Sequence, residues 1–361
     1  MDEVTTAAIL PSFFARWMDG LLPGPIPDEA RATCSNCAMV ATTDSERESG
    51  RFFGASAKCC THIPTMANYQ VGGVLSDESD EARPGRDGML QRLRAGDGVT
   101  PLGIAPPRRL SILYDLATPA FGNNTALMCP HFRDVDGGLC GIWRYRNSTC
   151  TTWFCKFNRG AVGLAFWTSL QQLLAALEQE LSWWAVLELN PGDDAVRRLL
   201  ALRSKPVNAP LNSADVDGTA KADVRSWGTW LGREEAFYIE AAKRVGALTW
   251  DEALAICGPT VRVAATVVRT HYDELISTDV PNRLAGGSFT VVSLDALRAT
   301  VSSYRSTDPL SMPRSVLDVI GEFDGSQTSD VLERIARTRG LRVAPSLVRK
   351  LADYGILKAA E

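Results

Sequence analysis

The sequence predicts a mainly α protein with an irregular, cysteine-rich metal-binding domain, a helical middle region and a small C-terminal domain. Two observations lead to this prediction. Eight of the nine cysteines lie between residues 34 and 155 of the 361-residue chain. Apolar residues recur at the spacing of an amphipathic helix in stretches on both sides of this segment. A chain of this length exceeds one compact core of the usual size, so we expect two or three domains.

The N-terminal segment, residues 1–28, is expected to hold one amphipathic helix over residues 4–22. Its apolar residues at helical spacing are Ile9, Leu10, Phe13, Phe14, Trp17, Met18 and Leu21. The proline-rich run 23–27 ends this helix, because proline cannot continue the helical hydrogen-bond pattern.

Residues 29–160 form the predicted metal-binding domain. Within it, residues 76–108 are rich in Asp, Arg, Gly and Pro, which predicts an exposed loop around a short helix near Met89–Leu93.

The remaining segments are the helical region 161–312 and the C-terminal domain 313–361. A strong apolar stripe predicts a helix from about residue 160 to 189. Further expected elements of the helical region are a polar linker at 203–226, helices at 232–246, 250–257 and 259–276, and a short strand at 288–293. In the C-terminal domain we expect helices at Ser315–Phe323, Ser329–Arg339 and Ser346–Tyr354, with a turn at Asp324-Gly325.

Composition and charge favour a cytoplasmic globular protein. Apolar residues make up 45% and charged residues 22% of the chain, and the formal net charge is −4. No basic excess suggests a nucleic-acid partner, and no apolar run approaches the length that spans a bilayer. The N-terminus is acidic, where a secretory signal peptide would be basic.

The clustered cysteines indicate metal binding, because structural disulfides are rare in a reducing compartment. Thiolates bind zinc or the iron of iron–sulfur clusters. Cys34 and Cys37 form a CxxC step, which lets two sulfurs converge on one ion, whereas the vicinal pair Cys59-Cys60 cannot easily do so without strain. The predicted metal ligands are Cys34, Cys37, Cys59, Cys60, Cys129, Cys140, Cys150 and Cys155. A thiol–disulfide relay remains an alternative, and Cys257 is expected to be a core residue.

For other residues of this segment we consider both a role at the metal and an ordinary structural role. His62 and His131 could replace a thiolate on the metal, although a structural histidine is more common. Arg144 and Arg146 could offset the charge of a thiolate cluster, although exposed arginines are the usual case. The aromatic residues Trp143, Tyr145, Trp153, Phe154 and Phe157 could shield a cluster from water or form ordinary core. No Walker loop, HExxH or GxSxG motif occurs, so no catalytic residue is assigned and enzymatic activity stays open.

The cysteine pattern resembles the YkgJ family, a family of zinc- or iron-chelating domains. The matching residues are Cys34-Ser35-Asn36-Cys37, Cys59-Cys60, Cys129-Pro130-His131-Phe132, Gly138-Leu139-Cys140-Gly141-Ile142, Cys150 and Trp153-Phe154-Cys155. The gap between Cys37 and Cys59 is long, and Asn147 replaces the proline that follows the arginine in the family pattern. The resemblance implies metal chelation, and covers only about residues 30–160.

Two further resemblances bear on function. The cysteine pattern is also similar to that of flagellin lysine N-methylase, which implies iron–sulfur-dependent methyl transfer. The C-terminal domain resembles a winged-helix or PqqD-like unit, which binds peptides, proteins or DNA.

Three functional hypotheses follow. The first is a metal-binding protein whose iron–sulfur cluster, of the 4Fe–4S type, serves electron transfer with a redox partner or a redox reaction. The second is an iron–sulfur-dependent enzyme that modifies a protein or peptide presented by the C-terminal domain. The third is a zinc-stapled interaction protein without catalysis. No nucleic-acid or membrane partner is expected.

Overall fold

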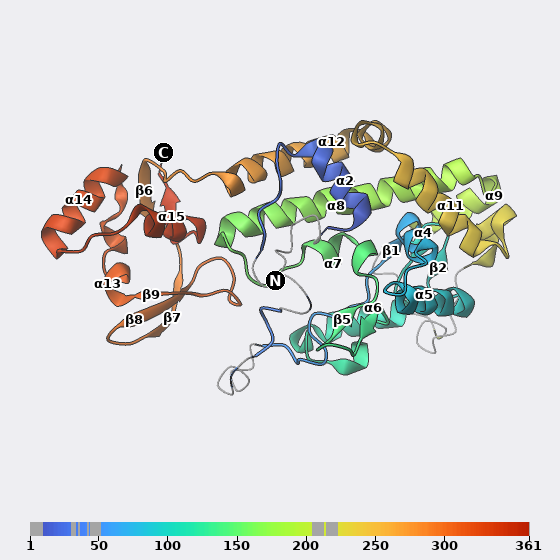
Figure 1. The fold of residues 1–361 in the computed structure, drawn as a ribbon, viewed down its shortest axis with the longest axis horizontal. Helices are drawn as coiled ribbons and strands as arrows, with labels where there is room; N and C mark the ends of the chain where they lie inside the picture. The colour runs from blue at the N-terminus through green and yellow to red at the C-terminus, as the bar shows by residue number, and fades with distance from the viewer. Residues whose placement is uncertain are drawn as a thin grey trace. The chain divides into compact units, whose positions relative to one another are not determined.

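The structure is a computed structural model that describes residues 10–29, 34, 37–41, 43, 52–203, 213 and 223–360. Figure 1 shows a mainly α chain with small antiparallel sheets, as the sequence predicts. Its contacts divide it into two compact units, which differ from the four segments expected above. The first unit comprises Met1–Pro25, Thr33–Trp153 and Gln171–Thr266, and the second comprises Ile26–Ala32, Phe154–Leu170 and Val267–Glu361.

The N-terminal helix is confirmed in its described part as α2 (Ser12–Leu21). Its buried side chains are Phe14, Trp17, Met18 and Leu21, at the spacing of one helical face. The helix ends where Leu22 turns to extended backbone before Pro23. Residues 4–9 of the expected helix lie outside the described residues.

Two short helices of the first unit pack closely against each other. They are α4 (Asn68–Ser76) and α11 (Glu234–Ala247). Helix α4 directly follows strand β1 (Met66–Ala67), which belongs to a three-stranded sheet with β3 (Gly103–Ile104) in the centre and β2 (Val99–Thr100) at the other edge. The contact requires glycine at position 72, because a Cβ there would approach the carbonyl oxygen of Tyr238 to 1.8 Å. This packing places α4 beside the cysteine segment described below.

The segment 76–108 is more helical than predicted. Instead of a loop with a short helix near Met89–Leu93, it contains the 13-residue helix α5 (Arg83–Ala95). Pro84 fits the first turn, and Gly96 ends the helix in the left-handed conformation with φ 71°. The helix lacks an apolar stripe, since only Gly85 and Met89 are buried, and periodicity therefore underestimated its length.

The helical region agrees closely with its prediction. The long helix α8 (Gly160–Leu189) covers the expected 160–189, and α11 covers most of 232–246. The expected helices at 250–257 and 259–276 form one element, α12 (Trp250–Ile276), with a kink at Gly258 (φ 74°) before Pro259. The region also contains α9 (Asp193–Arg203) and the 3₁₀ segment η4 (Val224–Trp230). Much of the expected linker 203–226 lies outside the described residues.

Two of these helices, α8 and α12, are long and apolar enough to cross a membrane by length and composition alone. Mean hydropathy reaches 1.3 in α8 and 1.2 in α12, and half of the α8 window is buried within the protein. This differs from the expectation that no segment approaches such a length. One or two helices of this kind are weak evidence for a membrane, because core helices of soluble proteins have the same properties.

The second unit contains two three-stranded antiparallel sheets around its own apolar core. One sheet has the order β7 (Thr290–Leu294), β8 (Arg298–Ser302), β9 (Leu310–Pro313), and the other β10 (Asp324–Gln327), β6 (Arg283–Gly286), β11 (Leu357–Ala359). Its short helices are α13 (Arg314–Leu317), η5 (Ile320–Glu322), α14 (Thr328–Arg339) and α15 (Pro345–Asp353). The buried core includes Leu284, Val301, Met312, Val331, Ile335, Val348, Leu351 and Ile356.

The expected elements of this unit are confirmed only in part. The helix expected at Ser315–Phe323 is divided into α13 and the 3₁₀ helix η5, and strands β6, β8, β9 and β11 were not predicted. The strand predicted at 288–293 is β7, and the last two predicted helices are α14 and α15. The predicted turn Asp324-Gly325 is wrong, because both residues belong to strand β10, which pairs with β6.

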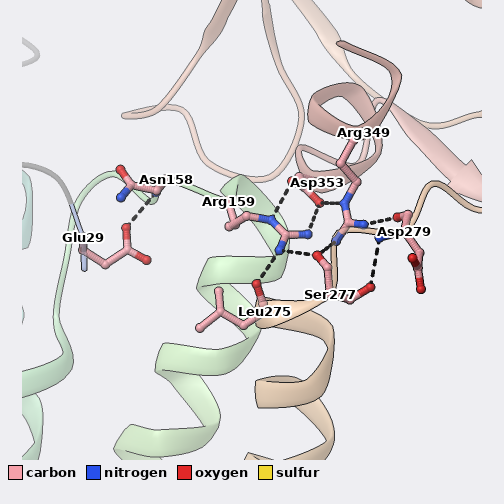
Figure 2. Close-up of polar contacts among 8 residues, drawn as sticks. All are labelled: Glu29, Asn158, Arg159, Leu275, Ser277, Asp279, Arg349 and Asp353. Carbon is pink, nitrogen blue, oxygen red and sulfur yellow. Dashed lines mark hydrogen bonds and ion pairs between the residues drawn. The ribbon is translucent and has the colours of Figure 1, made fainter. Parts of the chain in front are cut away.

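A buried carboxylate joins the start of α8 to α15 within the second unit (Figure 2). Asp353 accepts two hydrogen bonds from Arg159, each 2.7 Å long, and one of 2.8 Å from Arg349. The same two arginines also donate to backbone carbonyls at the end of α12 and beyond it, including Ser277 O at 2.9 and 2.6 Å. The two arginines thereby cap the C-terminus of α12, and their shared carboxylate holds α15, the end of α12 and the residue before α8 together.

Replacing Asp353 by alanine should destabilise the second unit, because two largely buried guanidinium groups lose their shared anion. We expect the free energy of unfolding to fall by about 3–5 kcal/mol, as measured by urea denaturation. Asp279→Ala is the matched control, since Arg349 bonds to the backbone carbonyl of Asp279 and not to its side chain. Equal stability of the two variants would contradict this role.

Candidate metal centre

The first unit brings the two cysteine groups together through backbone contacts. The amide of Cys129 donates to the carbonyl oxygen of Cys60 at 2.7 Å. The ammonium group of Lys58 donates to Gly138 O at 2.8 Å and also to Cys34 O. Cys34 and residues 58–60 therefore lie beside residues 129–138 in the fold, as a shared metal centre requires.

A small hairpin and a one-turn helix carry the second group. In the hairpin, β4 (Phe132–Arg133) pairs with β5 (Leu139–Cys140), so that Phe132 is opposite Cys140. Helix α7 (Ser148–Thr152) carries Cys150, whose amide donates to the side chain of Asn147 at 2.9 Å. Asn147, the departure from the family pattern, thus serves as the N-cap of this helix.

The thiols of the first unit lie close enough to influence one another's ionisation. Burial raises the pKa of Cys129 to about 12 and that of Cys140 to about 11, and neighbouring thiols add to both shifts. The pKa of Cys150 is raised by burial and by Cys129, Cys140 and Cys59. Each of these shifts therefore links cysteines that are far apart in the sequence.

The vicinal pair forms its own hydrogen bond. The Cys60 thiol donates to the Cys59 sulfur, which lowers the pKa of Cys59 to about 7 and raises that of Cys60. Cys34, in turn, interacts electrostatically with both Cys59 and Cys37, while burial raises its pKa. The seven cysteines linked in this way are Cys34, Cys37, Cys59, Cys60, Cys129, Cys140 and Cys150, and all belong to the first unit.

Cys155 belongs to the second unit, which holds its backbone firmly. Its carbonyl oxygen accepts a hydrogen bond from Thr307 at 3.2 Å. The preceding carbonyl, of Phe154, accepts one from Arg305 at 2.6 Å, and the Phe157 amide donates to Asp308 at 3.2 Å. The loop between β8 and β9 therefore fixes the chain on both sides of the last cysteine.

Two buried cations lie among the thiols. Arg146 is 5% exposed and stacks on the Trp143 ring, with its guanidinium carbon 3.3 Å from the ring centroid. It donates to the carbonyls of Trp143 and Cys150, both at 3.1 Å. Its electrostatic partners are the thiols Cys140, Cys150, Cys34 and Cys59. Lys58 is also 5% exposed and interacts with Cys34 and Cys59.

Burying a positive charge costs several kcal/mol unless an anion compensates it. The thiols around Arg146 and Lys58 supply this compensation only when they are ionised. The neighbouring Arg144 differs, because it is exposed and pairs with Glu81 at 3.1 Å on the surface. Of the two arginines considered from the sequence, only Arg146 is placed to neutralise a thiolate centre.

The two histidines of this region are also placed differently. His131 is 3% exposed, and both of its ring nitrogens are buried without a hydrogen-bond partner in the described part of the chain. Burial and the nearby Arg92 lower its pKa to about 4. His62 is exposed and contacts the ring of Tyr114, with centroids 5.2 Å apart.

The expected aromatic shell is divided between the two units. Trp143 lies under Arg146, whereas Trp153 is 46% exposed and contacts Phe121. Phe154 and Phe157 are buried in the second unit, where their rings contact each other.

The donor chemistry fits a thiolate-ligated metal, although the ligands are not drawn together around one point. Across the described ranges, no three Cys, His, Asp or Glu side chains are arranged so that they could hold a metal ion as placed. The fit rests on the gathered thiols, the two buried cations and the unpaired imidazole of His131. Metal binding commonly completes such a site, because its free energy is part of the folding free energy.

Sequence reasoning missed two supports of the site. Lys58 immediately precedes Cys59-Cys60, and its adjacency to a cysteine pair is the signal that could have identified it. Glu178 of α8 accepts from the amide and hydroxyl of Ser148 at 2.6 and 2.7 Å, and from Gln70 of α4 at 2.8 Å. Glu178 therefore fixes the first residue of the helix that carries Cys150.

The buried carboxyl of Glu178 should make stability depend on pH. Burial raises its pKa from 4.5 to about 7, so the folded protein binds a proton more tightly than the unfolded chain. The stabilisation of the folded state by this bound proton is fully present below pH 4.5 and is lost as pH rises through about 7. We expect Glu178→Gln to remove up to about 3 kcal/mol of this pH dependence, measured as thermal midpoints from pH 5 to 8. Glu180→Gln on the same helix is the control, and an unchanged profile in Glu178→Gln would refute the assignment.

Comparisons of the chain with protein-family models, curated proteins and solved structures gave no match.

Proposed function

We propose that the first unit holds a cysteine-ligated metal centre, an iron–sulfur cluster of the 4Fe–4S type, which serves electron transfer or a redox reaction. The observation that carries the proposal is the burial of Arg146 and Lys58 among thiols from both cysteine groups. Such cations favour ionised thiolates, and thiolates are the form in which cysteine binds metal.

The anionic character of the expected cofactor agrees with this charge pattern. A centre with four thiolate ligands carries net negative charge, whether it contains zinc or an iron–sulfur cluster. Arg146 also stacks on Trp143 and bonds to the Cys150 carbonyl, so its position is fixed beside the thiols. Positive charge fixed beside the thiols would stabilise the reduced, more negative state of a cluster.

The choice of an iron–sulfur cluster over zinc rests on the resemblance of the cysteine pattern. The YkgJ family is described as zinc- or iron-chelating, and the similarity to flagellin lysine N-methylase favours the cluster.

The second unit supplies an interaction surface in this proposal. Helices α14 and α15 are followed by strand β11, an order that is typical of winged-helix and PqqD-like units. Strand β6, from an earlier part of the chain, completes the sheet between β10 and β11. We assign this unit to binding a redox partner or a protein or peptide substrate. We also propose a cytoplasmic location, where reducing conditions keep clustered thiols available for metal.

Anaerobic purification of the full chain tests the centre directly. The protein should be brown, with broad visible absorption that dithionite bleaches, and should contain iron and acid-labile sulfide. The single variants Cys34→Ser, Cys129→Ser and Cys150→Ser should lose most of the metal and lower the thermal midpoint.

Cys257→Ser is the matched control, because Cys257 is buried in α12 and is expected to act only as a core residue. Loss of metal from this variant would refute the ligand assignment. A colourless protein with bound zinc would favour the zinc-stapled alternative, and a protein without metal would refute the centre altogether.

A further inference from the structure

We propose that the free edge of strand β7 pairs with the β7 strand of a second copy of the chain, so that the protein forms a two-fold symmetric dimer through its second unit. The inference goes beyond the proposed metal centre and does not depend on it. It rests on an uncovered strand edge and on an apolar layer that continues past the core as far as this edge.

Strand β7 lies at the edge of its sheet. The strand order is β7, β8, β9, and β7 pairs only with β8 among the described strands. All five of its residues are exposed, and none of them is charged or a proline. Natural proteins usually protect such an edge with charged side chains, with proline or with a covering segment. The outer N–H and C=O groups of β7 are therefore available to another extended strand.

A bulge gives this edge an apolar layer. Val291 lies opposite Val301 of β8 and Leu294 lies opposite Ala299, with Val292 as the extra residue between the two pairs. Directly opposed residues share a face of the sheet, and Val301 and Ala299 belong to the buried core of the unit. Val291 and Leu294 therefore both lie on the core face, although residues three apart would alternate in a regular strand.

The core does not cover these two side chains. Val291 is 45% exposed and Leu294 is 50% exposed, and Leu297 in the following turn is 80% exposed, the highest value among the large hydrophobic residues that the structure describes. Asp295 holds this turn by accepting hydrogen bonds of 2.8 Å from the amides of Leu297 and Arg298. An apolar surface that is held rigidly loses little conformational entropy when a partner covers it.

The strand that fits this edge is β7 of a second copy. The covering strand must be extended, with apolar residues on the core face and polar residues on the other face. Strand β7 meets both conditions, because Val291 and Leu294 lie on one face and Thr290 and Ser293 on the other. A two-fold axis normal to the sheet would pair the two strands antiparallel and keep each face on its own side. One contact would then remove both free edges and join the two apolar layers.

Charge is compatible with this contact. The formal net charge of −4 makes two copies repel each other at a distance, but residues 289–294, which would meet, carry no ionisable side chain. The adjacent Asp295 accepts hydrogen bonds from its own turn. A charged peptide would find no opposite charge along β7, so the edge favours a neutral strand such as β7 itself.

Sedimentation velocity of the full chain, under anaerobic reducing conditions and over a range of concentrations, tests the dimer directly. The wild type should sediment as a concentration-dependent dimer. The double variant Val291→Lys/Leu294→Lys should weaken dimerisation by about tenfold or more, because it places like charges against each other in the contact. Val263→Lys is the matched control, since this valine is 66% exposed on α12 in the first unit and should leave dimerisation unchanged.

Hydrogen–deuterium exchange of the wild type locates the contact. The amides of residues 290–294 should exchange more slowly in the dimer than in the dilute monomer. The inference is overturned if the wild type is monomeric at every concentration, including the case in which β7 binds a strand of another protein instead. It is also overturned if a dimer forms without protecting these amides, or if the double variant dimerises like the wild type.

The wild-type measurements decide the question even if the double variant fails to fold. None of them requires bound metal, so a monomeric protein would leave the proposed metal centre untouched, and a protein without metal would leave the dimer untouched.

Discussion

The constraint on which the site depends is the burial of positive charge beside cysteines. A guanidinium at position 146 and an ammonium at position 58 are withdrawn from water within the first unit. Backbone carbonyl oxygens accept hydrogen bonds from both cations, and thiols from both cysteine groups lie around them. Burial raises the pKa of several of these thiols, so the proposed metal, which binds cysteine as thiolate, would supply the negative charge that compensates the cations.

The fold supports this arrangement from several directions. Glu178 of the long helix α8 holds the start of α7, and Gln70 of α4 shares the same carboxylate. Helix α4 is held in turn by its close contact with α11 at Gly72. The described part of the cysteine segment has little regular structure of its own, so its geometry is fixed by these helices and by hydrogen bonds to its backbone. A metal would add to a framework that already orders part of the site.

The sequence predicted those parts of the fold in which local pattern and tertiary packing agree. The apolar stripe identified α8, and Gly258-Pro259 marked the kink of α12. The length of helix α5 is underestimated from the sequence because the helix buries little apolar surface. Asp324-Gly325 has the local preference of a turn, but pairing with β6 overrides this preference and places both residues in a strand.

For the site, the sequence identified the cysteines but not what surrounds them. Lysine is almost always exposed, so its place beside Cys59-Cys60 was the only local signal for Lys58, and its burial follows from the tertiary fold. Arg144 and Arg146 are two residues apart and chemically identical, and only the tertiary fold decides which one faces the thiols. The same holds for His62, which follows Cys59-Cys60, and His131, which follows Cys129-Pro130, because only the tertiary fold exposes the first and buries the second.

X-ray absorption at the metal edge of the anaerobically purified full chain tests the central claim most directly. A thiolate-ligated centre predicts stoichiometric metal whose nearest neighbours are mainly sulfur, at about 2.3 Å. A first shell made only of oxygen and nitrogen, or no metal above background, would contradict the account.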